Sequence, residues 1–233
     1  MTPIDIAAAV IFILCWVSYE PVLHSLSGKH GGINHDMAVV RETWIRRMLK
    51  RDMRLLDANL LNHLLTSASF FASTNLIVIA AAAGALFGGE SVFHSLHSLV
   101  LAAPAPNWLM EIKIALVVVT LSRGLLDFIW AIRQMNYCSA LFGAAPEADD
   151  VTRHDAFARA AINVLDPAFS SFNKGVRAYY FAMAAAAWLV NGWAMLFGVL
   201  AATFWLLRRQ VASQAAGGIR DARLMFEAET KGD

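Results

Sequence analysis

The chain has 233 residues, of which 58% are hydrophobic and 16% are charged, and its mean hydropathy is +0.52. A soluble domain carries about 25% charged residues, so this composition excludes an ordinary soluble protein and indicates one that lies in lipid. The formal net charge is +1, which argues against a nucleic-acid partner, because such proteins carry a strongly basic domain or face.

The first apolar segment covers residues 3–22. It is long enough to cross a bilayer, which takes about 20 apolar residues. No basic region precedes the segment and no convincing small-x-small cleavage site follows it, so we expect a retained helix rather than a signal peptide. Gly28, Gly31 and Gly32 then predict a loop.

Residues 37–63 predict a basic amphipathic helix. Apolar residues such as Ile45, Leu49 and Met53 recur at helical spacing, and basic residues gather on the other side. Such a helix is expected to lie in the interface plane against anionic headgroups, although a solvated elbow packed on the bundle is the alternative. The candidate lipid-surface residues are Arg46, Arg47, Lys50, Arg51 and Arg54.

The second apolar segment, residues 64–87, combines hydroxyl and amide side chains in its first half with small residues in its second half. Small residues let helices approach closely, and polar side chains can form hydrogen bonds across a helix interface. Asn75 either makes such a bond or belongs to a permeation path with Ser73 and Thr74.

The connection at residues 88–108 contains no lysine or arginine. His94 and His97 are three residues apart and could hold a metal ion on one helical face, but no third ligand is evident. Surface histidines are therefore the preferred interpretation, and no metal site is predicted.

The third apolar segment, residues 110–132, contains Arg123 and Asp127. A charge at membrane depth costs at least about 2.5 kcal/mol, so such residues are usually turned inward and paired. At a spacing of four these two can form an ion pair on their own helix. The pair either orients the helix in a bundle or lines a polar pathway with Ser73, Thr74 and Asn75, in which the arginine attracts an anion and the carboxylate carries a proton.

Residues 136–174 predict a polar cytoplasmic loop with a helical stretch from 152 to 165, ended by Asp166 and Pro167. The last apolar segment, residues 176–207, is longer than one crossing needs. Asn191 and Gly192 at its centre mark either a kink or a break into two half-helices.

The distribution of lysine and arginine predicts the orientation. The basic segment after the first span should face the cytoplasm, which places the N-terminus outside and residues 136–174 inside. Four crossings then send the C-terminus outside, although Arg208, Arg209, Arg220 and Arg223 favour the inside. A re-entrant final segment would remove this conflict.

Enzyme signatures are missing from the sequence. It has no GxSxG, HExxH, Walker loop or glycine-rich dinucleotide turn. The histidines fall in loops or at span edges, which disfavours a membrane haem, and Cys15 and Cys138 are far apart with no CxxC spacing. We therefore expect a protein that is not an enzyme and has no cofactor.

Four strings in the chain resemble an uncharacterised membrane family, domain of unknown function 599, from about residue 38 to 209: RETWIRRMLKRDMRLLDANLL, FFASTNLIVIAAAAGAL, FIWAIRQMNY followed by LFGAAP, and FNKGVRAYYFAMAAAAWLVNGWAM. The resemblance implies a four-span integral membrane protein and carries no known activity. Arg123 and Asp127 are not among the motif residues. The matching positions are Arg41, Trp44, Arg51, Asp52, Asp57, Phe71, Ala72, Ser73, Thr74, Trp130, Arg133, Asn136, Tyr137, Asn173, Arg177, Tyr179 and Tyr180.

The expected fold is therefore all-α: a polytopic membrane protein forming a single domain, with four transmembrane helices and one basic interfacial helix. Two functions are expected, a channel or carrier for a small ion, or a non-catalytic scaffold or accessory subunit. The expected partners are the lipid bilayer and its anionic headgroups, with a second copy or another membrane protein, and the expected location is a cell membrane of the bacterial inner-membrane type. A shared site is expected first at the cytoplasmic face: Trp130, Arg133, Asn136, Tyr137, Asn173, Arg177 and Tyr180.

Overall fold

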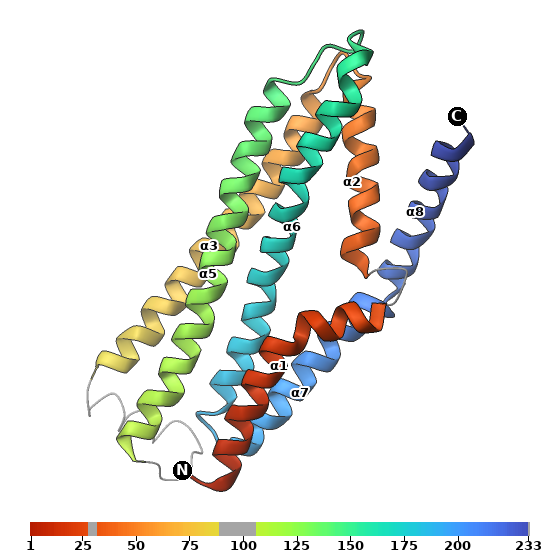
Figure 1. Ribbon diagram of the computed structural model, residues 1–233. Helices are drawn as coiled ribbons and strands as arrows, with labels where there is room; N and C mark the ends of the chain where they lie inside the picture. The colour runs from red at the N-terminus through yellow and green to blue at the C-terminus, as the bar shows by residue number, and fades with distance from the viewer. Residues whose placement is uncertain (28–31, 89–105, 233) are drawn as a thin grey trace. The chain divides into compact units, whose positions relative to one another are not determined.

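The computed structural model describes residues 1–27, 32–88 and 106–232, and every regular element within them is a helix (Figure 1). The all-α prediction is confirmed. Four helical segments are long and apolar enough to cross a membrane: Pro3–Leu23, Leu55–Phe87, Asn107–Gly143 and Gly192–Glu229. In chain order the helices are α1 (Pro3–Ser27), α2 (Ile33–Leu49), α3 (Leu55–Phe87), α5 (Asn107–Gly143), α6 (Val151–Ala187), α7 (Gly192–Val211) and α8 (Gln214–Gly232).

The helices form two compact units, which we call the apolar unit and the polar unit. The apolar unit comprises Met1–Leu23, Ala72–Leu126 and Lys174–Leu207, and the polar unit comprises His24–Phe71, Asp127–Asn173 and Arg208–Asp233. Helices α3, α5 and α6 each contribute one part to the apolar unit and the other part to the polar unit.

The core of the apolar unit joins four helices. Phe12 of α1, Phe181 of α6 and Met195 of α7 are fully buried in one cluster, which Leu109 of α5 also enters. The rings of Phe12 and Phe181 meet edge to face with centroids 5.7 Å apart. Such aromatic pairs stabilise a contact beyond their burial alone, so this cluster holds α1 against α6 and α7.

Helices α6 and α7 form an antiparallel hairpin (Figure 1). The turn follows Ala187, and the Asn191 side chain accepts a hydrogen bond of 2.8 Å from the Ala194 N–H at the start of α7. A Cβ added to Gly198 would lie 3.3 Å from the Ala184 Cα, and these residues are equally far in sequence from Asn191. The last apolar segment is therefore broken into two helices.

Helix α6 also corrects the prediction that Asp166 and Pro167 end a helix, because it runs through both residues. A proline inside a helix costs about 3 kcal/mol, since it removes one hydrogen bond and crowds the preceding turn. The flanking Leu165 and Ala168 are fully buried in the core of the polar unit. Burial of the α6 face that carries Leu165 and Ala168 therefore outweighs the local cost of a proline inside the helix.

Two further boundaries differ from the predicted ones. Residues 37–63 do not form one helix, because α2 ends at Leu49 and α3 begins at Leu55. Residues 136–174 are not a loop, because α5 continues to Gly143 and α6 starts at Val151. At both bends the apolar faces of the flanking helices pack into one core. The buried residues of this core are Ile45, Met48, Leu49, Leu61, Cys138, Ala158, Ala161 and Leu165.

Candidate functional site

The predicted ion pair lies on α5, and the structure places Arg123 on the exposed surface and Asp127 in a half-buried position. Counted from Asn107 at 1.5 Å per residue, Arg123 lies about 24 Å and Asp127 about 30 Å along the helix. The hydrocarbon layer is about 30 Å thick. Arg123 therefore falls toward one edge of a span that begins at Asn107, where a long side chain can reach the headgroups.

The neighbouring polar cluster on α3 does not share one face. Ser73 is exposed, Thr74 is half-buried, and Asn75 is buried. The Asn75 Nδ2 donates a 3.0 Å hydrogen bond to the Leu121 carbonyl oxygen of α5, which is the inter-helix bond anticipated for it.

The same region of the apolar unit is closely packed. A Cβ added to Gly124 of α5 would lie 2.7 Å from the Ala178 Cβ of α6, so only glycine fits there. That added atom would also lie 3.5 Å from the Asn75 Nδ2. Asn75 is thus held at a contact of three helices, whereas Arg123 and Ser73 face outward.

The first part of the candidate cytoplasmic-face motif lies along one exposed face of α5. Trp130 and Tyr137 are 51% and 46% exposed, and Arg133 stands between them. The Arg133 Nε donates a 2.6 Å hydrogen bond to the Tyr137 hydroxyl, and the guanidinium lies 5.9 Å from the centre of that ring. Asn136 is also exposed.

The second part of that motif makes other contacts. In the polar unit, the Asn173 Nδ2 donates a 2.8 Å hydrogen bond to the Asn34 Oδ1. In the apolar unit, Arg177 donates a 2.9 Å hydrogen bond to Glu20 and lies over the Tyr19 ring at 4.6 Å. Tyr180 is half-buried. The motif residues therefore belong to separate sets of contacts.

Most of the candidate lipid-surface residues contact protein groups in the polar unit. Arg46 binds Glu42 at 2.9 Å and also binds Asp155, and its guanidinium holds the pKa of the Asp155 carboxyl below the usual value. Arg47 binds Glu229 of α8 at 3.0 Å. Lys50 is exposed, and contact of these side chains with lipid stays a prediction.

Arg54 joins two stretches of backbone. Its guanidinium donates hydrogen bonds to the carbonyl oxygens of Leu49 and Arg51, and to those of Ala145 and Pro146 in the segment between α5 and α6. The shortest of these bonds, to Pro146, is 2.6 Å. A planar group with five N–H donors suits this arrangement, which positions both bends of the polar unit.

A buried carboxylate explains why three residues of the first family string occur together. Asp57 is fully buried, and its Oδ1 accepts hydrogen bonds from the Trp44 Nε1 at 2.7 Å and from the Arg51 Nη1 at 2.6 Å. Trp44 lies on α2, Arg51 lies in the bend between α2 and α3, and Asp57 lies in the first turn of α3. The three side chains close this bend.

Arg41 of the same string joins α2 to α6. Its Nε donates a 2.6 Å hydrogen bond to the Asp166 Oδ1, and its guanidinium lies 4.7 Å from the centre of the Phe169 ring. The Arg41 side chain is only 8% exposed, so this carboxylate compensates for the burial of its charge.

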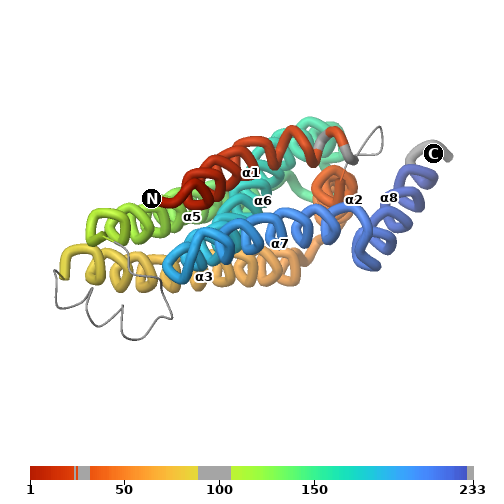
Figure 2. The backbone as a smooth tube through the Cα atoms, turned by 90° about the horizontal axis from the view of Figure 1, so that it is seen from below, coloured from red at the N-terminus to blue at the C-terminus, as the bar shows by residue number. Residues whose placement is uncertain are grey.

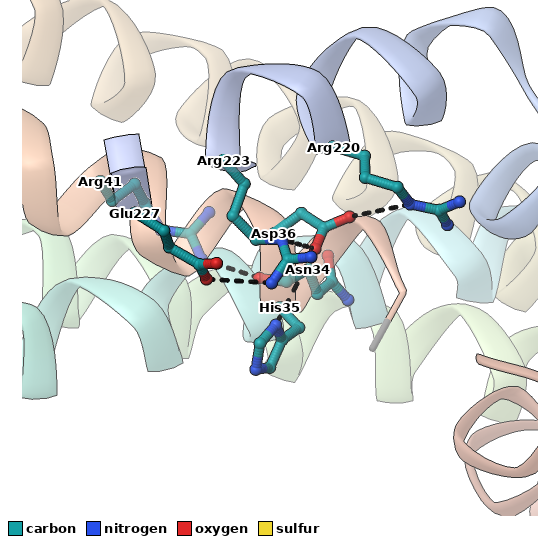
Figure 3. A network of polar contacts seen from close by, with 7 residues as sticks. All are labelled: Asn34, His35, Asp36, Arg41, Arg220, Arg223 and Glu227. Carbon is teal, nitrogen blue, oxygen red and sulfur yellow. Dashed lines mark hydrogen bonds and ion pairs between the residues drawn. The ribbon is translucent and has the colours of Figure 1, made fainter. Parts of the chain in front are cut away.

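A second buried carboxylate, Asp36 of α2, was missed by sequence reasoning (Figure 3). The Arg223 Nε of α8 lies 2.9 Å from its Oδ1, and the Arg220 Nε lies 3.9 Å from its Oδ2. The Arg223 Nη1 also donates a 2.9 Å hydrogen bond to Glu227. Figure 2 shows α8 beside α2, which is viewed close to end-on. In the sequence, the one indication of this contact was the presence of arginines near the C-terminus.

The described residues contain no group of three or more histidine, cysteine, aspartate or glutamate side chains that could hold a metal ion. His94 and His97 lie outside the part of the chain that the structure describes. In the polar unit, the polar side chains that the fold brings together form ion pairs and hydrogen bonds between helices.

These features define a multi-pass helical membrane protein. The chain matches the family described as "Protein of unknown function, DUF599" over residues 7–215, and it belongs to that family. The match ends just after α8 begins, so Arg220, Arg223 and Glu227 lie beyond it. No curated protein and no solved structure matches the chain.

Proposed function

We propose that this protein is a non-catalytic scaffold or accessory subunit of a membrane complex, in a cell membrane of the bacterial inner-membrane type. The observation that carries the proposal is the use of charge in the polar unit. The buried carboxylates of Asp36 and Asp57 form ion pairs with arginines of the same unit, and the buried Arg41 forms an ion pair with Asp166. Groups that a catalyst would direct at a substrate hold helices together here.

An exposed apolar surface in the polar unit supports this function. Met53, Leu55, Leu56 and Leu60 are 78%, 65%, 62% and 47% exposed around the start of α3. Counted along α3 from Phe87, Leu56 lies about 46 Å away, whereas the hydrocarbon layer is about 30 Å thick. Apolar side chains grouped beyond the lipid are typical of a surface that binds another protein.

The test is gentle extraction of the tagged protein from its native membranes after chemical crosslinking. We expect a different membrane protein to co-purify with the parent and to be lost from a Leu56→Glu, Leu60→Glu variant that remains folded. Val151→Glu is the control, because Val151 is 69% exposed at the start of α6 and is not one of the four residues of this surface. A chain that runs alone or only with copies of itself would reject the accessory role.

An ion channel or carrier is the second candidate function. It is favoured by the Asn75 Oδ1, which is buried without a hydrogen-bond partner within the described residues. In liposomes, a carrier that uses this oxygen would lose flux in Asn75→Leu, and one that uses the α5 charges would lose flux in Arg123→Ala or Asp127→Asn. Flux that is equal in the parent and all three variants across a panel of ions would reject this candidate.

A further inference from the structure

Arg133 differs from those arginines of the polar unit that bind a carboxylate on another helix. Arg41, Arg47 and Arg223 each bind a carboxylate of another helix. For Arg133 no carboxylate within ion-pair distance occurs among the described residues, and α5 has no acidic residue between Asp127 and its end. Its one hydrogen bond within that part of the chain runs from Nε to the Tyr137 hydroxyl.

This hydrogen bond orients Arg133 for a ligand. With Nε engaged and the guanidinium held near the Tyr137 ring, the terminal nitrogens remain available to bind an anion. Because the Tyr137 hydroxyl accepts the bond from Nε, its own proton can be donated to the same anion. Trp130, Arg133 and Tyr137 lie at spacings of three and four residues, so they share one face of α5.

The position of this face along α5 places it at the depth of the lipid headgroups. Trp108, which is 49% exposed, marks the start of the helix as an interfacial aromatic residue would. From Asn107, Trp130 lies about 35 Å and Arg133 about 39 Å along α5, or about 32 and 37 Å across a bilayer at the average helix tilt of about 20°. These depths fall in the headgroup layer just beyond about 30 Å of hydrocarbon.

We propose that Trp130, Arg133 and Tyr137 form a binding site for the phosphate of an anionic phospholipid headgroup. The terminal nitrogens of Arg133 bind two phosphate oxygens, which is the geometry that favours arginine over lysine. The Tyr137 hydroxyl donates to a phosphate oxygen, and the Trp130 ring packs against the glycerol and upper acyl region. This site is independent of the scaffold function.

The experiment measures retained lipid on the full chain in a neutral detergent. Phosphatidylglycerol is titrated against phosphatidylcholine, and bound lipid is counted by native mass spectrometry. We expect a preference for phosphatidylglycerol in the parent, a loss of about tenfold in its affinity in Arg133→Ala, and a smaller loss in Arg133→Lys and Tyr137→Phe. Circular dichroism and thermal unfolding verify that each variant is folded.

Arg159→Ala is the matched control. Arg159 is an exposed arginine of α6 and lies one turn from Asp155. The proposal is overturned if Arg159→Ala weakens phosphatidylglycerol binding as much as Arg133→Ala, because charge alone would then explain the binding. It is also overturned if the parent shows no lipid preference, or if millimolar inorganic phosphate displaces the lipid equally from the parent and from Arg133→Ala.

Discussion

Replacing Asp36 with alanine is expected to release α8 from α2. The Asp36 side chain is 2% exposed and the Arg223 side chain 11%, so the variant removes the buried carboxylate from Arg223 and leaves it paired with Glu227 of its own helix. Removing one partner of a buried ion pair costs about 3–5 kcal/mol. Because α8 follows a short bend after α7, it can detach while the rest of the chain stays folded.

The measurement is amide hydrogen exchange in detergent micelles. Exchange in α8 should accelerate by about two to four orders of magnitude, which is what 3–5 kcal/mol of lost docking energy produces, while exchange in α5 stays unchanged. Asp155→Ala is the control, because Asp155 pairs with Arg46 at the surface, where water and salt screen an ion pair and leave it little effect on stability. Unchanged protection of α8 in Asp36→Ala would show that apolar contacts alone hold it.

Arg54→Ala is expected to destabilise the whole polar unit. The substitution removes every hydrogen bond by which the guanidinium joins the α2–α3 bend to the segment before α6. A half-buried charged donor of this kind contributes about 2–3 kcal/mol, because the released carbonyls regain only part of their solvation. Arg54→Lys should recover less than half of this, since an ammonium cannot present a planar fork.

Equilibrium unfolding in mixed micelles gives the free energy of unfolding for each variant. Lys50→Ala is the matched control, since Lys50 is an exposed cation of the same bend and should change stability by no more than about 0.5 kcal/mol. If Arg54→Ala were no more destabilised than Lys50→Ala, the carbonyl contacts would have no part in stability.

The candidate site could be predicted only in part. The sequence places Trp130, Arg133 and Tyr137 on one helical face, because a spacing of three and four residues is sufficient for that. It also indicated the inter-helix role of Asn75, but it did not show which face of α5 is exposed. The structure turns Gly124 toward α6 and leaves Arg123 outward, and only the neighbouring helices decide that rotation.

The sequence by itself determined the helical class and the membrane character, and it marked Asn191 as the place of a kink or a break. These follow from composition and from local backbone preferences, which need no knowledge of distant residues. Family membership was also evident from local strings and is confirmed over residues 7–215.

Only the tertiary structure decided where the buried charges are paired and where several helices end. Asp36 and Arg223 lie at opposite ends of the chain, and Arg41 and Asp166 belong to different helices, so no spacing rule could join them. Helix α6 continues through Pro167 because burial of its apolar face outweighs the local penalty. Burial and desolvation depend on which segments meet in space, and that information is carried by the whole fold rather than by any one stretch of residues.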